Sequence, residues 1–186
     1  PTLERFYLDL RDPNYQTALA VFHQRYSTNT FPTWPLSQSL RMLSHNGEIN
    51  TVQGNCLWTK AREPDLKSPF FGDAIKNLRP IIQPGGSDSA ALDNALEVLV
   101  MGGRDILHSM LMLVPAAWQG DASVPNEVKD FYEYHQTLNE PWDGPAALVF
   151  SDGRTIGAVL DRNGLRPSRY KSTDDGLICL GSEVGL

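Results

Sequence analysis

Cysteine is scarce in this chain, since only Cys56 and Cys179 occur among its 186 residues. A small secreted fold stapled by disulfides would need more of them, so the composition favours a reducing compartment. We expect the cytoplasm, or a plastid in a photosynthetic eukaryote. Both cysteines are flanked by apolar residues, a setting that raises the pKa of a thiol. We therefore predict that both are buried and that neither is a nucleophile.

Long apolar runs are also lacking. The most hydrophobic part of the sequence is interrupted by Gly102, Gly103 and Pro115, and it falls short of the roughly 18 apolar residues that a membrane-spanning helix needs. The first twelve residues contain no apolar core of the kind found in signal peptides. These absences predict a protein without a membrane partner.

Positive charge is not in excess either. Lys and Arg number 16 against 22 Asp and Glu, which gives a formal net charge of −6. Proteins that bind nucleic acids gain affinity by clustering basic residues against phosphates. The densest basic cluster, within residues 162–171, lies in a stretch that is typical of a turn. Nucleic acid is therefore not an expected partner.

Metal and cofactor motifs are missing from the sequence. The four histidines form no HxxxH pair, and the two cysteines have no CxxC spacing. No glycine-rich phosphate loop or cluster-type set of cysteines occurs. We expect neither a metal nor a cofactor to be bound by these residues.

The pattern that is present predicts one α+β domain, because helical periodicity fills the middle and short strands with turns fill the end. We predict helices over 51–63, 89–101, 104–114 and 125–138, followed by an antiparallel meander of strands over 146–150, 155–160, 168–172 and 177–181. Before these elements we expect a strand over 4–10, a short helix after Pro13, a buried strand ending at Arg25 and another strand over 40–44. Asn46-Gly47 is typical of a hairpin turn.

Four polar residues suit an amino-acid amide as substrate. Arg25 offers a planar fork for a carboxylate, and Asp88 offers an anion for an ammonium group. The Asn46 side chain and the Gly47 N–H are two donors of the kind that form an oxyanion hole. Each residue also has an ordinary explanation, namely a surface ion pair for Arg25, a hairpin tip for Asn46-Gly47 and a helix cap for Asp88.

Four blocks carry a resemblance to a known family: RYSTNTFPTWP at 25–35, HNGEINTVQGN at 45–55, GGSDSAALDNALE at 85–97, and the long block at 142–170. Their order, with Asn46 following Arg25 by 21 positions and Asp88 following Asn46 by 42, is similar to that of the class II glutamine amidotransferase domain of glutamate synthases. The resemblance covers nearly all of residues 1–186.

The resemblance implies an N-terminal-nucleophile hydrolase with a four-layer αββα sandwich. It implies that Asn46 and Gly47 form the oxyanion hole and that Arg25, Tyr26, Thr28 and Asp88 bind L-glutamine. The DRNGLRP loop at 161–167 would support the site from behind. The catalytic residue of the family is a cysteine at the first position, whereas this sequence begins with Pro1. We therefore expect the central and C-terminal part of the domain, without its first strand and inactive alone.

The same resemblance implies partners and cofactors outside these residues. The parent would be a large subunit whose other domains carry FMN and a 3Fe-4S cluster and use the ammonia to convert 2-oxoglutarate to glutamate. The electron donor would be ferredoxin or a small NAD(P)H-oxidising subunit. Two alternatives stay open, a glutamine-sensing module without catalysis and the amidotransferase domain of another biosynthetic enzyme.

Overall fold

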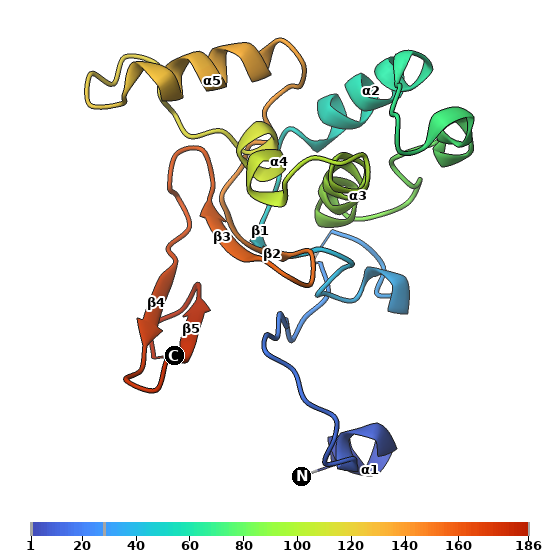
Figure 1. The fold of residues 1–186 in the computed structure, drawn as a ribbon, viewed down its shortest axis with the longest axis vertical. Helices are drawn as coiled ribbons and strands as arrows, with labels where there is room; N and C mark the ends of the chain where they lie inside the picture. The colour runs from blue at the N-terminus through green and yellow to red at the C-terminus, as the bar shows by residue number, and fades with distance from the viewer. Residues whose placement is uncertain (1, 28, 186) are drawn as a thin grey trace.

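The computed structural model describes residues 2–27 and 29–185. Five strands form two antiparallel sheets, and helices gather on one side of the larger sheet (Figure 1). The strands are β1 (Leu43–Gly47), β2 (Ala146–Ser151), β3 (Ile156–Leu160), β4 (Arg169–Ser172) and β5 (Ile178–Gly181). The α-helices are α1 (Leu3–Phe6), α2 (Val52–Arg62), α3 (Asp88–Met101), α4 (Ile106–Leu113) and α5 (Asn126–Gln136), and 3₁₀ turns cover Leu8–Arg11, Trp34–Leu36, Glu63–Asp65 and Gly72–Leu78.

The larger sheet has the order β1-β2-β3, with Leu43 opposite Phe150 and Gly47 opposite Ala146. Directly opposed residues share a face, so Leu43 and Phe150 both point toward the helices. The other face carries the alternate residues, including Leu160 of β3, which is 40% exposed. The second face is therefore exposed along β3, whereas Ser44 of β1 and Ala147 of β2 on the same face are 6% and 8% exposed.

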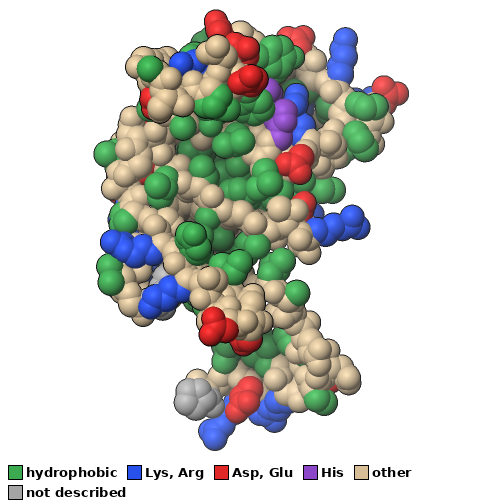
Figure 2. All heavy atoms as spheres, turned by 60° about the vertical axis from the view of Figure 1, so that its left-hand side comes forward, with side chains coloured by type: hydrophobic (Ala, Val, Ile, Leu, Met, Phe, Trp, Pro, Cys, Tyr) green, Lys and Arg blue, Asp and Glu red, His purple; other side chains and the backbone are tan. Residues whose placement is uncertain are grey.

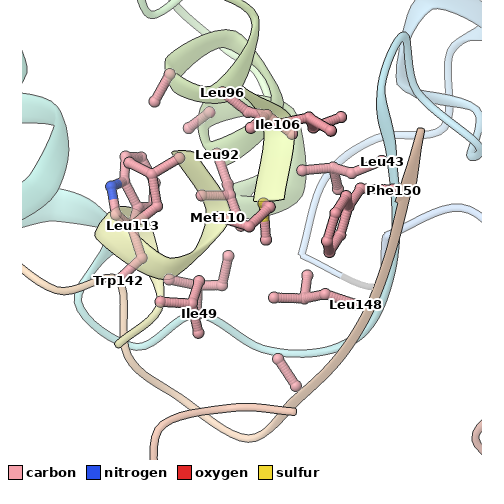
Figure 3. Packing of buried hydrophobic residues seen from close by; sticks show 14 residues of the cluster. Leu43, Ile49, Leu92, Leu96, Ile106, Met110, Leu113, Trp142, Leu148 and Phe150 are labelled. Atoms are coloured by element: carbon pink, nitrogen blue, oxygen red, sulfur yellow. The ribbon is translucent and has the colours of Figure 1, made fainter. Parts of the chain in front are cut away.

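The hydrophobic core lies between that sheet and helices α3 and α4 (Figure 3). Leu92 and Leu96, four residues apart on α3, meet Met110 of α4 and Leu43 of β1 in one cluster. This is the helical period predicted from the sequence. Ser87 caps α3 by accepting a hydrogen bond from the N–H of Ala90 at 3.1 Å.

The predictions for the middle and the end of the chain are largely confirmed. Helices α2, α3, α4 and α5 occupy the predicted segments, and all four late strands form. The four late strands do not form the single predicted meander, because β4 and β5 pair with each other in a separate sheet instead of extending the β1-β2-β3 sheet. Cys179 of β5 is exposed, so its predicted burial is wrong.

The predictions for the first third are mostly wrong. Residues 4–10 form α1 and a 3₁₀ turn instead of a strand. The short helix predicted directly after Pro13 does not form over residues 13–24. The strand expected before Arg25 is replaced by an exposed, irregular segment that runs out as an arm at the bottom of Figure 1. A strand needs a neighbour to pair with, and the described residues supply only the isolated bridge between Tyr26 and Ser37.

The described residues contain no helix that is long and apolar enough to cross a membrane. Many hydrophobic side chains nevertheless reach the surface, from the helical layer down to the narrow lower part of the molecule (Figure 2). Phe6, Phe22 and Tyr170 are more than 70% exposed.

Candidate active site on strand β1

Strand β1 lies at the edge of its sheet, and its N–H groups point alternately toward β2 and away from it. The N–H of Glu48 donates to Pro145 O at 2.9 Å, which places the N–H groups of the even-numbered residues of this strand on the β2 side. The N–H groups of the odd-numbered residues therefore face the other side, called here the open edge of β1. They belong to Leu43, His45, Gly47 and, just past the strand, Ile49.

Side chains from elsewhere in the chain occupy three of these four N–H groups. The acceptors are Asp93 Oδ1 for Leu43 N at 3.0 Å, Gln38 Oε1 for His45 N at 2.6 Å, and Asp88 Oδ2 for Ile49 N at 2.8 Å. The fourth N–H is that of Gly47, and it has no hydrogen-bond partner among residues 2–27 and 29–185. The open edge thus leaves one backbone donor available, at the position predicted for an oxyanion-hole donor.

Glycine is required at position 47 by both backbone angle and space. Its φ of 145° is unfavourable for residues with a side chain. A Cβ atom placed there would lie 1.8 Å from Pro145 O. The prediction of a hairpin tip at Asn46-Gly47 is wrong, because both residues pair with β2 at the end of β1. The glycine serves a close approach of two backbones instead of a turn.

Asn46 points to the face of the sheet that the helices leave uncovered. Its Nδ2 donates to Ser182 Oγ at 2.7 Å, and since an amide group carries two hydrogens, one further hydrogen bond can be donated. Asn46 also lines a cleft of about 380 Å³ together with Val149, His23 and Ser182. This cleft is large enough for a small amino acid.

Asp88 is the first residue of α3 and reaches toward β1. Its Oδ2 binds the N–H of Ile49, two positions beyond Gly47, and its Oδ1 accepts from the N–H of Ser89 at 2.7 Å. Ser87, and not Asp88, is the helix cap. A carboxylate offers about four lone-pair directions, so these two bonds leave acceptor capacity for a ligand ammonium.

The remaining predicted residues lie before β1. Arg25 is exposed, and it forms no ion pair with any of the described residues. Tyr26 is partly buried and bridges to Ser37, the neighbour of Gln38. Thr28 lies outside the described residues. The structure therefore places Asn46, Gly47 and Asp88 at the same end of β1. Asn46 lines the cleft, whereas Gly47, Asp88, Tyr26 and Arg25 are not among its lining residues.

Two residues of this region were not predicted as functional. His45 is 3% exposed, its Nε2 has no hydrogen-bond partner among the described residues, and burial lowers its pKa, with the Asp88 carboxylate acting in the opposite direction. Gln38 is 9% exposed and binds the His45 N–H. Burial of polar residues beside Asn46 is a signal only in three dimensions, so the sequence alone could not have selected them.

The loop at 161–167 is tied to the same strand pair. Asp161 accepts hydrogen bonds from the N–H of Ala146 at 3.0 Å and from that of Arg166 at 2.9 Å, and Ala146 lies opposite Gly47. Gly164 has a positive φ of 63°, which suits a glycine in a turn. The loop thus hydrogen-bonds to the residue of β2 that lies opposite Gly47.

The cysteines do not supply a nucleophile to this region. Cys56 lies on α2, and burial raises the pKa of its thiol as predicted. Cys179 is in the exposed β4-β5 sheet. Neither residue lines the cleft beside Asn46. Among the described residues no group of three or more potential ligands could hold a metal ion.

Comparison with known proteins identifies the family of this chain. The family model described as "Glutamine amidotransferases class-II" matches residues 1–186. The chain belongs to this family.

This amidotransferase chain is also similar to much longer proteins. It is 50% identical over 184 residues to "Glutamate synthase [NADPH] large chain" of Bacillus subtilis, and 51% identical over 184 residues to the protein of the same name in Azospirillum brasilense. It is 50% identical over 187 residues to "Ferredoxin-dependent glutamate synthase, chloroplastic" of Oryza sativa. Each match covers 99% of this chain and 12% of the relative. The chain therefore spans about an eighth of the length of these relatives.

Proposed function

We propose that this chain is the glutamine-hydrolysing part of a glutamate synthase large subunit. The observation that carries the proposal is the open edge of β1, where, among residues 2–27 and 29–185, only the N–H of Gly47 keeps no hydrogen-bond partner, next in sequence to the Asn46 amide. Family membership and the similarity to glutamate synthases support it. The domain would extend beyond these 186 residues, which would supply its central and C-terminal part.

In this mechanism a cysteine thiol from outside these residues attacks the side-chain amide carbon of L-glutamine. Negative charge then develops on the amide oxygen, where the Gly47 N–H and the free hydrogen of the Asn46 amide would stabilise it. The α-amine of the same cysteine would relay the proton to the leaving ammonia. Water then releases glutamate from the thioester.

The ends of glutamine would be held by opposite charges. Asp88 would accept from the α-ammonium group, and Arg25 would bind the α-carboxylate with its planar fork. Tyr26 and Thr28 would line the pocket beside Arg25. Residues 20–24 already line the cleft, so the role of the exposed Arg25 requires only that its side chain turn toward the cleft when substrate or the preceding strand is present.

The complete domain would be a four-layer αββα sandwich. This is supported by strand β3, whose Ile156, Ala158 and Leu160 are exposed on the face of the β1-β2-β3 sheet that points away from the helices. A second sheet packed there would bury these side chains. The first strand of the domain, carrying the nucleophile, would belong to that layer.

The ammonia would be used elsewhere in the same large subunit. The remaining domains would bind FMN and a 3Fe-4S cluster and would convert 2-oxoglutarate to glutamate. Electrons would come from ferredoxin or from a small NAD(P)H-oxidising subunit, in line with the names of the relatives. We propose the cytoplasm or a plastid as the compartment.

The test uses a large subunit that contains these residues. Changing Arg25→Ala or Asp88→Asn should raise the KM for glutamine roughly 10- to 100-fold, because a hydrogen bond to a charged group contributes about 1.5–3 kcal/mol, while ammonia-dependent glutamate synthesis stays unchanged. Arg154→Ala, at an exposed Arg in the β2-β3 turn, is the matched control. Equal loss of both activities would count against the proposed binding roles.

A separate measurement tests the position of the nucleophile. The 186-residue chain by itself should release no ammonia from glutamine, because neither of its cysteines lines the cleft. Steady ammonia release by this chain would show that its residues suffice for catalysis and would overturn the proposed mechanism.

A further inference from the structure

The side chains that bind N–H groups along the open edge of β1 come from separate parts of the chain. Gln38 precedes the strand, whereas Asp88 and Asp93 both lie on α3. Asp93 is 4% exposed, and its Oδ1 accepts from two consecutive N–H groups, those of Met42 at 2.9 Å and Leu43 at 3.0 Å. Neither Gln38 nor Asp93 has a role in the proposed chemistry.

Burial of these two groups is costly unless their bonds to β1 repay it. A carboxylate removed from water loses its hydration, and burial raises the pKa of Asp93 against the effect of its backbone hydrogen bonds. An apolar side chain of similar volume could fill the same space without that cost of lost hydration. The polar side chains are therefore explained by the groups that they bind, namely the N–H groups of Met42, Leu43 and His45, which all precede Gly47.

Resting on the function proposed above, we infer that Gln38 and Asp93 are positioning residues for glutamine hydrolysis. They fix the backbone of β1 on the side of the open edge that precedes Gly47, while Asp88 fixes the side that follows it. The Gly47 N–H is thereby held in one direction, and among the described residues it is the one N–H group of the open edge left free to join the Asn46 amide in binding the substrate oxygen.

This arrangement predicts a particular kinetic effect. An oxyanion-hole donor stabilises charge that exists mainly in the transition state, so misdirecting it lowers kcat more than it changes KM. The His45 N–H lies two residues from Gly47 on the same edge, and its acceptor in Gln38 is 2.6 Å away. Loss of that acceptor should therefore change the direction of the Gly47 N–H.

The experiment compares two isosteric changes of Gln38 in a large subunit that contains this domain. Gln38→Met removes the acceptor and should lower the glutaminase kcat roughly 10- to 100-fold, with a nearly unchanged KM for glutamine. Gln38→Glu keeps an oxygen acceptor and should restore most of the rate. Asp93→Asn, which keeps the oxygen but loses the charge, should fall between the two. Competent sites are counted by covalent labelling with an electrophilic glutamine analogue.

The control is Glu63→Gln, because Glu63 is 8% exposed and also accepts from a backbone N–H, that of Ile81, away from β1. Its kcat should equal that of the wild type. A wild-type kcat in Gln38→Met, or an equal loss in Glu63→Gln, would overturn the positioning role.

Hydrogen–deuterium exchange of peptides covering residues 42–50 separates this inference from the proposed function. Gln38→Met should speed exchange in these peptides, and Glu63→Gln should not. If the wild type hydrolyses no glutamine, the proposed function fails, and faster exchange would still support the placement of Gly47 by Gln38. Unchanged exchange would overturn the inference whatever the activity.

Discussion

The two sheets of this molecule differ in how much hydrophobic burial stabilises them. In the β1-β2-β3 sheet, Leu43, Leu148 and Phe150 are at most 3% exposed and pack against α3 and α4 (Figure 3). In the β4-β5 sheet, Tyr170 is 72% exposed and Ile178 is 69% exposed. Hydrophobic burial therefore stabilises the first sheet far more than the second.

The proposed site draws on both kinds of structure. Asn46, Gly47 and Asp88 belong to the packed region, where side chains fix the backbone. Arg25 belongs to the exposed arm, and Ser182, the partner of Asn46, follows the exposed β5. The proposed oxyanion donors would thus be preorganised, whereas the proposed groups that would close over the substrate would need a further layer to hold them.

The largest effect is expected at Gly47. Gly47→Ala would place a Cβ 1.8 Å from Pro145 O, so β1 and β2 would have to separate. We expect a loss of roughly 3 kcal/mol or more in the free energy of unfolding and a fall in glutaminase kcat of at least about 100-fold. Urea unfolding of the chain and kinetics of the large subunit measure the two.

Gly54→Ala provides the control for that change. Gly54 lies within α2, and a Cβ there meets no atom within 4 Å. Alanine should therefore stabilise the protein by about 0.5–1 kcal/mol. Similar losses at both glycines would show that the close approach at Gly47 is not what the fold depends on.

The success of sequence-based prediction differs between the packed and the exposed parts of the molecule in the same way. Helix α3 was predictable, because the spacing of Leu92 and Leu96 is a local signal, although its cap is Ser87 and not Asp88, the residue considered from the sequence. The segment before Arg25 was not, because a strand is decided by pairing partners, and the described residues supply only the bridge at Tyr26. Local patterns succeed where local bonds and one packed face determine the structure.

The candidate site shows the same limit. The family resemblance selected Asn46, Gly47 and Asp88, which the structure brings to one end of β1. It gave no reason to select Gln38, whose role depends on a hydrogen bond to His45 across a connection that has no sequence signature. Cys179 was misjudged because apolar neighbours in a strand do not show whether a sheet is covered.

The next largest effect tests the packed region directly. Leu96 of α3 is fully buried in the core cluster, so Leu96→Ala should lower the free energy of unfolding by about 2–5 kcal/mol. Leu57→Ala on α2 removes the same atoms from a side chain that is 62% exposed, and it should stay within about 0.5 kcal/mol. Urea denaturation compares the two. Equal losses would mean that α3 and α4 do not pack on β1 as described.

A smaller effect is expected from pH, because α4 and α5 meet through two histidines. His135 Nδ1 lies 2.7 Å from Phe131 O, so it donates there, and its Nε2 accepts from His108 Nε2 at 2.8 Å. Burial and then the neighbouring His135 lower the pKa of His108. A lowered pKa means that the unfolded chain binds the proton more readily, so stability should fall as the pH drops below about 6.5.

The urea midpoint measured between pH 7.5 and pH 5 checks this expectation. His108→Gln keeps a donor toward His135 but cannot be protonated, so it should flatten part of the decline. Burial also lowers the pKa of His45, which leaves a residual slope in the variant. An unchanged slope in His108→Gln would remove His108 from the explanation.

The smallest effect is expected in the β4-β5 sheet. Ile178→Thr replaces a side chain that is 69% exposed by another residue that favours strands, so the free energy of unfolding of the 186-residue chain should change by no more than about 0.5 kcal/mol. The same substitution in a large subunit sharpens the comparison of the two sheets. If it costs clearly more there, a neighbouring segment covers β5, and Ser182 and the Asn46 amide that it binds are then held as firmly as Gly47. An equally small change in both contexts would mean that the β4-β5 sheet stays open, and that the Asn46 side chain is positioned by β1 alone.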